Sequence, residues 1–257
     1  MIHKPAALVL GALAALAAGQ QSPEEAEERF SAQVKAEPSD AAAWKALGLL
    51  RASLGRPRAA AEALEHACTL RPADEESCYY YGRGLFALGR YEDAVRPLET
   101  ALRAAPADRR WRVHRALARN FEWLGRAADA ERSFREAIRL GRGRAASAED
   151  PRIDFGSFLY RQGRTADALA PLREAAAEPS AGARAHTELG RVLLQLERPE
   201  AAAESLEKAV RLDPRDWAAH LLLGQAYQQA GRPDDDAREL SIGRQGLDPP
   251  QGSSTVR

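Results

Sequence analysis

The sequence predicts an all-α protein made of about six stacked helical hairpins, with a half-unit at the N-terminal end. Three observations lead to this fold class. Strong helix formers such as Ala, Leu, Arg and Glu are abundant in the 257-residue chain, and β-branched residues are few. A turn signal, usually Gly, recurs about every 34 residues, which is typical of repeat architectures. Between the turn signals, the apolar residues follow the spacing of amphipathic helices.

Residues 1–19 are predicted to be a signal peptide rather than part of the fold. Lys4 precedes an apolar run from Ala6 to Ala18, and Gly19 stands directly before a suitable cleavage point at Gln20. The run is about 13 residues long, whereas roughly 20 are needed to span a bilayer. We therefore expect an exported protein, periplasmic or secreted. An uncleaved N-terminal helix that acts as a membrane anchor is the alternative interpretation.

The turn signals give the order and bounds of the units. They fall at Gly55, Gly89, Gly125, Gly163, Glu197 and Gly231. A half-repeat is expected over 24–38, followed by repeats over about 41–74, 75–108, 111–144, 149–182, 183–216 and 217–250. The last residues, 249–257, are rich in Pro, Gly and Ser, and this composition predicts a disordered tail.

Each repeat is predicted to hold two antiparallel helices that cannot bury their apolar faces alone. In the first repeat Trp44 and Leu47 mark one helix, Gly55 ends it, and Ala60 and Leu64 mark the second. Small residues recur where the two helices approach. The first helices carry Gly48, Gly82, Ala118, Gly156, Gly190 and Gly224, and the second helices carry Ala60, Ala94, Ala130, Ala168 and Ala202.

This pattern resembles the tetratricopeptide repeat. The first unit matches it with Trp44, Leu47, Gly48, Ala60, Leu64, Ala67 and Pro72, and the fifth with Leu189, Gly190, Leu193, Ala202, Leu206, Ala209 and Pro214. The sixth unit departs from it, because Asp236 and Gly243 occupy the two alanine positions. The resemblance covers about residues 24–248. It implies a single superhelical domain over 20–248 that binds proteins or peptides in a concave groove.

The resemblance places the groove on the first helix of each unit. The implied groove residues are Lys45, Tyr79, Arg83, Phe86, Arg112, Arg115, Arg119, Trp123, Tyr160, Arg184 and Arg191. Arg112, Arg115 and Arg119 share one helical face. Two interpretations remain open for these three arginines: a solvated face neutralised by nearby carboxylates, or a site for an acidic segment or C-terminal carboxylate. The family's carboxylate clamp is not carried over, because Leu49 replaces its asparagine.

No residue pattern indicates catalysis, a cofactor or a metal. His114, His186 and His220 occupy the same position in different repeats, so they are expected to be too far apart to bind one ion. We find no nucleophile elbow and no phosphate-binding loop. The 37 basic and 37 acidic residues balance, which argues against a nucleic-acid partner.

Two cysteines, Cys68 and Cys78, flank the turn between the first and second units. Two interpretations remain open for this pair: a disulfide, which an exported protein would favour, or two free thiols that pack as small apolar side chains.

The predicted function is a non-catalytic scaffold for another protein or peptide, with an acidic segment as one candidate ligand. The alternative is an accessory subunit of a cell-envelope assembly or of polysaccharide or protein export machinery. Leu240 and Ile242 in the last repeat lack an obvious capping helix, which suggests weak self-association through the C-terminal repeat.

Overall fold

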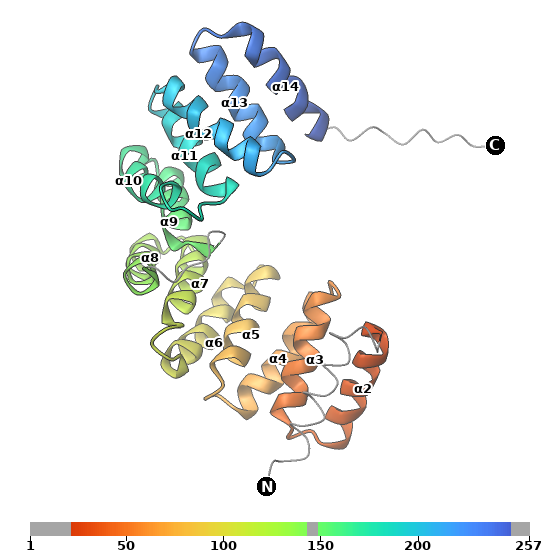
Figure 1. Cartoon of the computed structure of the whole chain (residues 1–257). Coiled ribbons are helices and arrows are strands. Elements are labelled where there is room, and N and C mark those ends of the chain that lie inside the picture. The colour runs from red at the N-terminus through yellow and green to blue at the C-terminus, as the bar shows by residue number, and fades with distance from the viewer. Residues whose placement is uncertain (1–21, 143–148, 248–257) are drawn as a thin grey trace, which may run out of the picture. The chain divides into compact units, whose positions relative to one another are not determined.

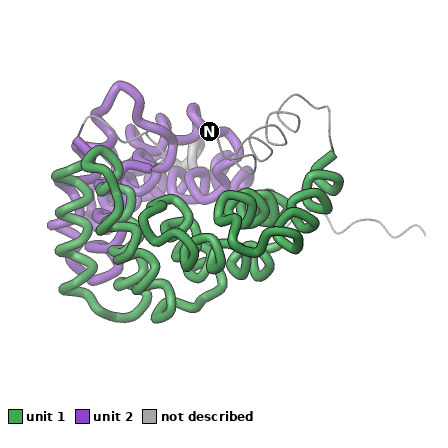
Figure 2. The backbone as a smooth tube through the Cα atoms, turned by 90° about the horizontal axis from the view of Figure 1, so that it is seen from below, with its two compact units in different colours: residues 1–140 green, residues 141–257 purple. Residues whose placement is uncertain are grey.

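The computed structural model describes residues 22–142 and 149–247 (Figure 1). Every long element in these ranges is an α-helix and no strand occurs in them, which confirms the all-α prediction. The predicted signal peptide (1–19) and tail (249–257) lie outside the described residues. The residues form two compact units, each with most of its contacts within itself: unit 1 extends to Leu140 and unit 2 begins at Gly141 (Figure 2). The expected single domain over 20–248 stays a prediction.

Unit 1 begins with a lone helix and continues with three helical pairs. Its helices are α2 (Pro23–Ala36), α3 (Ala41–Ser53), α4 (Pro57–Leu70), α5 (Glu75–Ala87), α6 (Tyr91–Ala104), α7 (Arg110–Trp123) and α8 (Ala127–Gly141). Ser22 caps α2, and Glu25 completes a capping box by accepting a hydrogen bond from the Ser22 amide. Phe30 and Val34 of α2 pack into a core cluster with Leu47 of α3, so the lone helix covers the first pair.

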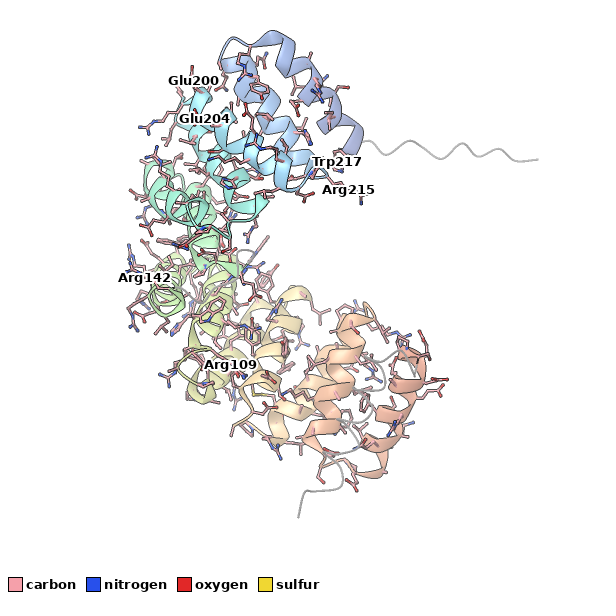
Figure 3. All side chains as sticks on the ribbon, in the orientation of Figure 1. Arg109, Arg142, Glu200, Glu204, Arg215 and Trp217 are labelled. Carbon is pink, nitrogen blue, oxygen red and sulfur yellow. A yellow bond between two sulfur atoms is a disulfide. The ribbon has the colours of Figure 1, made fainter. Side chains whose placement is uncertain are left out.

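Unit 2 contains three further helical pairs. Its helices are α9 (Pro151–Arg161), α10 (Thr165–Ala176), α11 (Ala183–Gln195), α12 (Pro199–Leu212), α13 (Trp217–Gln229) and α14 (Pro233–Leu247). Trp217 stands beside Arg215 at the start of α13 and is partly exposed (Figure 3). Leu240 of α14 and the nearby Ile242 are both half-buried, and Leu240 lies against Gly224 of α13. Self-association through this last repeat stays a prediction.

The two helices of a pair approach most closely where glycine in the first helix meets leucine in the second. A Cβ atom added to Gly190 would lie 2.4 Å from Cγ of Leu206, and one added to Gly48 would lie 2.6 Å from Cγ of Leu64. The sequence pattern had assigned this role to the alanine four residues before each leucine. That alanine contributes its backbone instead, since the carbonyl oxygen of Ala60 would lie 3.2 Å from the Gly48 Cβ.

Five of the six hairpin turns contain glycine in the left-handed region. Gly55, Gly89, Gly125, Gly163 and Gly231 have φ between 69° and 75°. Glu197 occupies the same position between α11 and α12 with φ of 55°, and it is the single non-glycine residue with positive φ in the described ranges. The Arg198 amide donates to the Leu193 carbonyl at 3.0 Å, as the Arg56 amide does to the Arg51 carbonyl at 2.9 Å. The turn geometry is therefore kept although the side chain disfavours it.

Cys68 at the end of α4 and Cys78 in α5 form a disulfide in the structure. Cys78 is fully buried and Cys68 is half-buried. The bond closes a loop with a sequence separation of 10 across the turn between the first two hairpins. A loop of this size corresponds to about 2–3 kcal/mol of stabilisation by chain entropy.

The three repeated histidines have separate environments. His114 is half-buried in unit 1, whereas His186 and His220 are buried in unit 2. Nδ1 of His220 lies 2.5 Å from a Glu239 carboxylate oxygen, and its Nε2 lies 3.2 Å from the Pro214 carbonyl oxygen. His220 is therefore held by polar contacts with its own surroundings in unit 2.

The close glycine contact predicts opposite effects for two glycine-to-alanine substitutions. Gly190→Ala should lower the free energy of unfolding by about 1–3 kcal/mol, because its Cβ would collide with Leu206. Gly84→Ala should raise it by about 0.5–1 kcal/mol, because its Cβ would lie 3.6 Å from Ala61, at ordinary contact distance, and alanine favours the helix. Urea unfolding of both variants and of the parent chain measures these changes in the free energy of unfolding. Equal effects would contradict the role assigned to the glycine–leucine contact.

Burial of two histidines predicts loss of stability in mild acid. Burial lowers the pKa of His186 below 6.5, and the nearby charges of Lys208 and Arg211 lower it further. Burial likewise lowers the pKa of His114. The unfolded chain then binds these protons more tightly, so stability is full above pH 6.5 and falls as the pH drops below that value. His186→Gln should flatten the pH dependence of the melting temperature in this range; an unchanged profile would argue against the assignment.

Candidate functional site

The predicted groove residues all lie on the first helix of a hairpin, called the A-helix here. The A-helices are α3, α5 and α7 in unit 1, and α9, α11 and α13 in unit 2. Within unit 1, α5 contacts both α3 and α7, and within unit 2, α11 contacts both α9 and α13. The candidate residues therefore form two sets, one on each unit.

Tyr79 of α5 anchors one end of the unit 1 set. Its ring is 4% exposed, and it has a guanidinium group nearby from each of two A-helices. The Arg112 guanidinium of α7 lies 5.1 Å from the ring centroid, and that of Arg83, one turn further along α5, lies 5.6 Å from it. Both distances are within the range of cation–π attraction, so Tyr79 links the arginines of neighbouring repeats.

A second aromatic group follows along the same two helices. The Arg119 guanidinium lies 5.0 Å from the Phe86 ring centroid. Phe86 meets Tyr91 edge-on at 5.3 Å, and Tyr91 stacks on Trp123 at 5.4 Å with an interplanar angle of 16°. Trp123 is 62% exposed, more than any other large apolar side chain in the described residues. The arginine–aromatic face is defined as Tyr79, Arg83, Phe86, Tyr91, Arg112, Arg119 and Trp123.

Two residues that support this face were missed by the sequence reasoning. Asn120 is fully buried, and its Nδ2 donates a hydrogen bond of 2.7 Å to the Tyr91 carbonyl oxygen. This bond holds the start of α6 against α7 and so positions the Tyr91 ring next to Trp123. Tyr91 was overlooked because it belongs to a second helix. Asparagine is unfavourable inside a helix, and that was the available signal.

Helix α7 is strongly basic. It contains Arg110, Arg112, Arg115 and Arg119, whereas Glu122 is its single acidic residue. Its first turn carries no acidic residue, although negative charge is the favourable choice at a helix N-terminus. Arg112 and Arg115 are half-exposed and Arg119 is exposed. Basic residues therefore outnumber acidic ones on α7.

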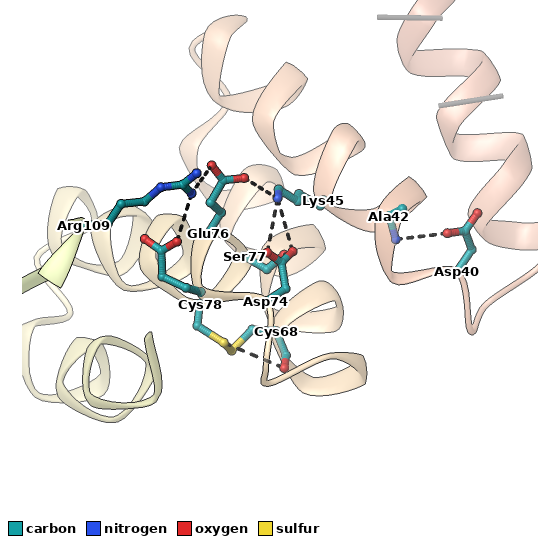
Figure 4. A network of polar contacts seen from close by, with 10 residues as sticks. Asp40, Ala42, Lys45, Cys68, Asp74, Glu76, Ser77, Cys78 and Arg109 are labelled. Carbon is teal, nitrogen blue, oxygen red and sulfur yellow. Dashed lines mark hydrogen bonds and ion pairs between the residues drawn. A yellow bond between two sulfur atoms is a disulfide. The ribbon is translucent and has the colours of Figure 1, made fainter. Parts of the chain in front are cut away.

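Lys45 is engaged within the protein rather than projecting from it. Its Nζ lies 2.5 Å from a Glu76 carboxylate oxygen and 3.2 Å from one of Asp74 (Figure 4). Arg109 reaches the other side of Glu76 at 3.1 Å and also Glu75 at 3.2 Å. Burial alone would lower the pKa of Lys45, but the hydrogen bond and charge of Glu76 and the charge of Asp74 raise it. Lys45 thus joins α3 to α5.

A hollow of about 530 Å³ lies beside the arginine–aromatic face. Its lining is mostly apolar and comes from α3, α4 and α5. The lining residues that come from the A-helices α3 and α5 are Leu49, Ala52, Tyr80, Arg83, Gly84 and Ala87. Arg83 therefore belongs both to the charged face and to the rim of an apolar hollow.

In unit 2 the structure separates the three predicted residues. Arg184 makes an ion pair of 2.6 Å with Asp154 of α9, which is buried. Tyr160 and Arg191 instead line a hollow of about 700 Å³ together with residues that the sequence reasoning did not select. The polar members of this lining, called the unit 2 pocket, are Tyr160, Arg191, Gln195, Glu197, Gln225 and Gln229.

The described residues contain no group of three or more His, Cys, Asp or Glu side chains that could hold a metal ion. Across the same ranges, none of the helices has both the length and the apolar character required to cross a membrane.

Models of the tetratricopeptide repeat match most of the chain. One model matches residues 10–75, 153–216 and 187–241, which is more than half of the sequence, and a second matches 51–119. No curated protein matches the sequence.

Solved structures share this fold at low sequence identity. PilF of Pseudomonas aeruginosa is 22% identical with a TM-score of 0.67, and the match covers 88% of this chain and 97% of that one. A chain of the Cut9–Hcn1 hetero-tetramer of the APC/C is 16% identical with a TM-score of 0.67; the match covers 84% of this chain but spans only 42% of that one. YrrB, described as having an unusual peptide-binding site, is 22% identical with a TM-score of 0.53, over 75% of this chain and 96% of that one.

At these identities the structural similarity concerns the fold. Together with the family models, it accounts for the repeated hairpins. The chain therefore belongs to the tetratricopeptide repeat family, whose fold is generally a scaffold for protein–protein interaction.

Proposed function

We propose that the chain is a non-catalytic scaffold that binds an extended, acidic segment of another protein on the A-helices of unit 1. The observation that carries this proposal is the arginine–aromatic face. It combines arginines from two A-helices with aromatic rings, and its outermost ring, Trp123, is 62% exposed. Arginine and tryptophan are the residue types that contribute most to binding energy at protein interfaces.

The charge of α7 supports an acidic ligand. This helix contains four arginines and one glutamate, and its first turn has no acidic residue. A carboxylate from a partner would gain bidentate hydrogen bonds from arginine and would offset the unfavourable charge at the helix N-terminus.

The neighbouring apolar hollow supports a ligand that also carries an apolar side chain. Arg83 stands at its rim, so an acidic residue followed by an apolar one would satisfy both features. Lys45 is not part of this proposed site, because Asp74 and Glu76 already neutralise it.

We also propose that the protein acts outside the cytoplasm, periplasmic or secreted. The support is the pattern of residues 1–19 together with the pairing of Cys68 and Cys78, since disulfides persist in oxidising compartments. In that setting, an accessory role in a cell-envelope assembly or export system is a narrower form of the same scaffold function.

Charge reversal on the arginine–aromatic face tests the proposal. The probe is a set of short peptides that mix Asp, Glu and Leu, beside a matched set with Asn and Gln in place of the acids. The double variant Arg83→Glu/Arg119→Glu should bind the acidic set roughly tenfold more weakly at low salt, because two attractions become repulsions. Fluorescence anisotropy measures the affinities.

The matched control is Arg132→Glu/Arg135→Glu on α8, where both arginines are exposed and lie outside the A-helices. This control should keep the acidic preference of the parent chain. The proposal fails if the parent chain shows no preference for the acidic set, or if the two double variants lose equal amounts of affinity.

A further inference from the structure

The unit 2 pocket has a chemistry different from that of the arginine–aromatic face. Three glutamine side chains line it, Gln195 from α11 and Gln225 and Gln229 from α13. Within the described part of the chain, none of the three amides has a hydrogen-bond partner. Each amide offers both donor and acceptor groups, which is what an extended peptide backbone requires.

The two charged residues of this pocket, Arg191 and Glu197, differ in their contacts within the protein. Arg191 lies 3.6 Å from Glu188, one turn earlier on α11, so its charge is partly offset. Glu197 is exposed and makes neither an ion pair nor a side-chain hydrogen bond within the described residues. Of the two charged residues in the lining, Glu197 is thus the one whose side chain lacks an intramolecular partner among the described residues.

Glu197 also has an unusual backbone conformation. It occupies the left-handed position that glycine fills in the other five hairpin turns. A side chain is disfavoured there, so glutamate at this position stores strain that glycine would not. The strained residue is the one that places a carboxylate at the rim of the unit 2 pocket.

From these observations we infer that the unit 2 pocket binds a peptide segment through an arginine or lysine side chain, with Glu197 as its specificity-determining residue. The glutamines contact the backbone of the segment, and the Glu197 carboxylate pairs with the cationic side chain. This inference rests on the proposed peptide-binding function but not on the basic face of unit 1. The ligand side chain is positively charged here, whereas an acidic segment is proposed for unit 1.

A structural role is the competing explanation, because a carboxylate near the start of α12 is favourable towards the helix dipole. Two variants separate these roles. Glu197→Gln keeps the shape of the side chain and removes its charge, whereas Glu197→Gly restores the residue of the other turns. Glu200→Gln is the matched control, since Glu200 is an exposed residue of α12 that does not line the pocket (Figure 3).

The probe is a set of short Ser- and Thr-rich peptides with one central arginine, beside identical peptides with citrulline, its uncharged isostere. The parent chain should prefer arginine over citrulline by about threefold to tenfold at low salt. Glu197→Gln and Glu197→Gly should both abolish that preference, and Glu200→Gln should keep it. The melting temperature of Glu197→Gly should stay constant or rise by about 1–3 °C.

Two results would overturn the inference: a parent chain that does not distinguish arginine from citrulline, or Glu197 variants that keep the preference. A lower melting temperature for Glu197→Gly with an unchanged preference would assign Glu197 the structural role. If the parent chain still binds acidic peptides in any of these cases, only this inference has failed. If the parent chain binds neither peptide set, the proposed function is rejected as well.

Discussion

The contact between a glycine of the A-helix and a leucine of the second helix is the constraint on which five of the six hairpins depend; Ala118 takes the glycine position in the α7–α8 hairpin. At Gly48, Gly156 and Gly190 an added Cβ would lie 2.4–2.6 Å from a leucine Cγ, so a larger residue would displace the leucine side chain. The hairpins also pack on their neighbours, and both kinds of contact bury part of each A-helix. The A-helix positions that stay exposed can carry residues for binding.

Unit 1 and unit 2 use that freedom differently. In unit 1, the Tyr79 ring lies within cation–π distance of Arg83 and of Arg112 from the next repeat, and the Phe86 ring lies within that distance of Arg119. Buried Asn120 fixes the Tyr91 ring that supports Trp123, so even the exposed end of the face is ordered by a core contact. The unit 2 pocket instead presents three amides and the Glu197 carboxylate beside Tyr160 and Arg191. Both sites thus depend on residues that the repeat pattern does not specify.

The fold could be predicted from sequence because Gly55, Gly89 and the equivalent turns repeat at nearly constant spacing and define each hairpin locally. The helices that carry the candidate residues were predicted for the same reason. Partners across helices were not: the pairing of Lys45 with Glu76 joins residues 31 positions apart, and no local pattern encodes it. The sequence showed Glu197 in a glycine position, but its place at the rim of a pocket depends on α13 packing beside α11.

Chemical-shift mapping of the four tryptophan indole N–H signals during titration with an acidic peptide tests the central claim most directly. The account predicts that the Trp123 signal shifts, because this ring ends the arginine–aromatic face and is 62% exposed. The signals of Trp44, which donates to the Pro38 carbonyl, and of Trp111, which is 5% exposed, should stay in place. Saturable binding that leaves the Trp123 signal unchanged would contradict the account.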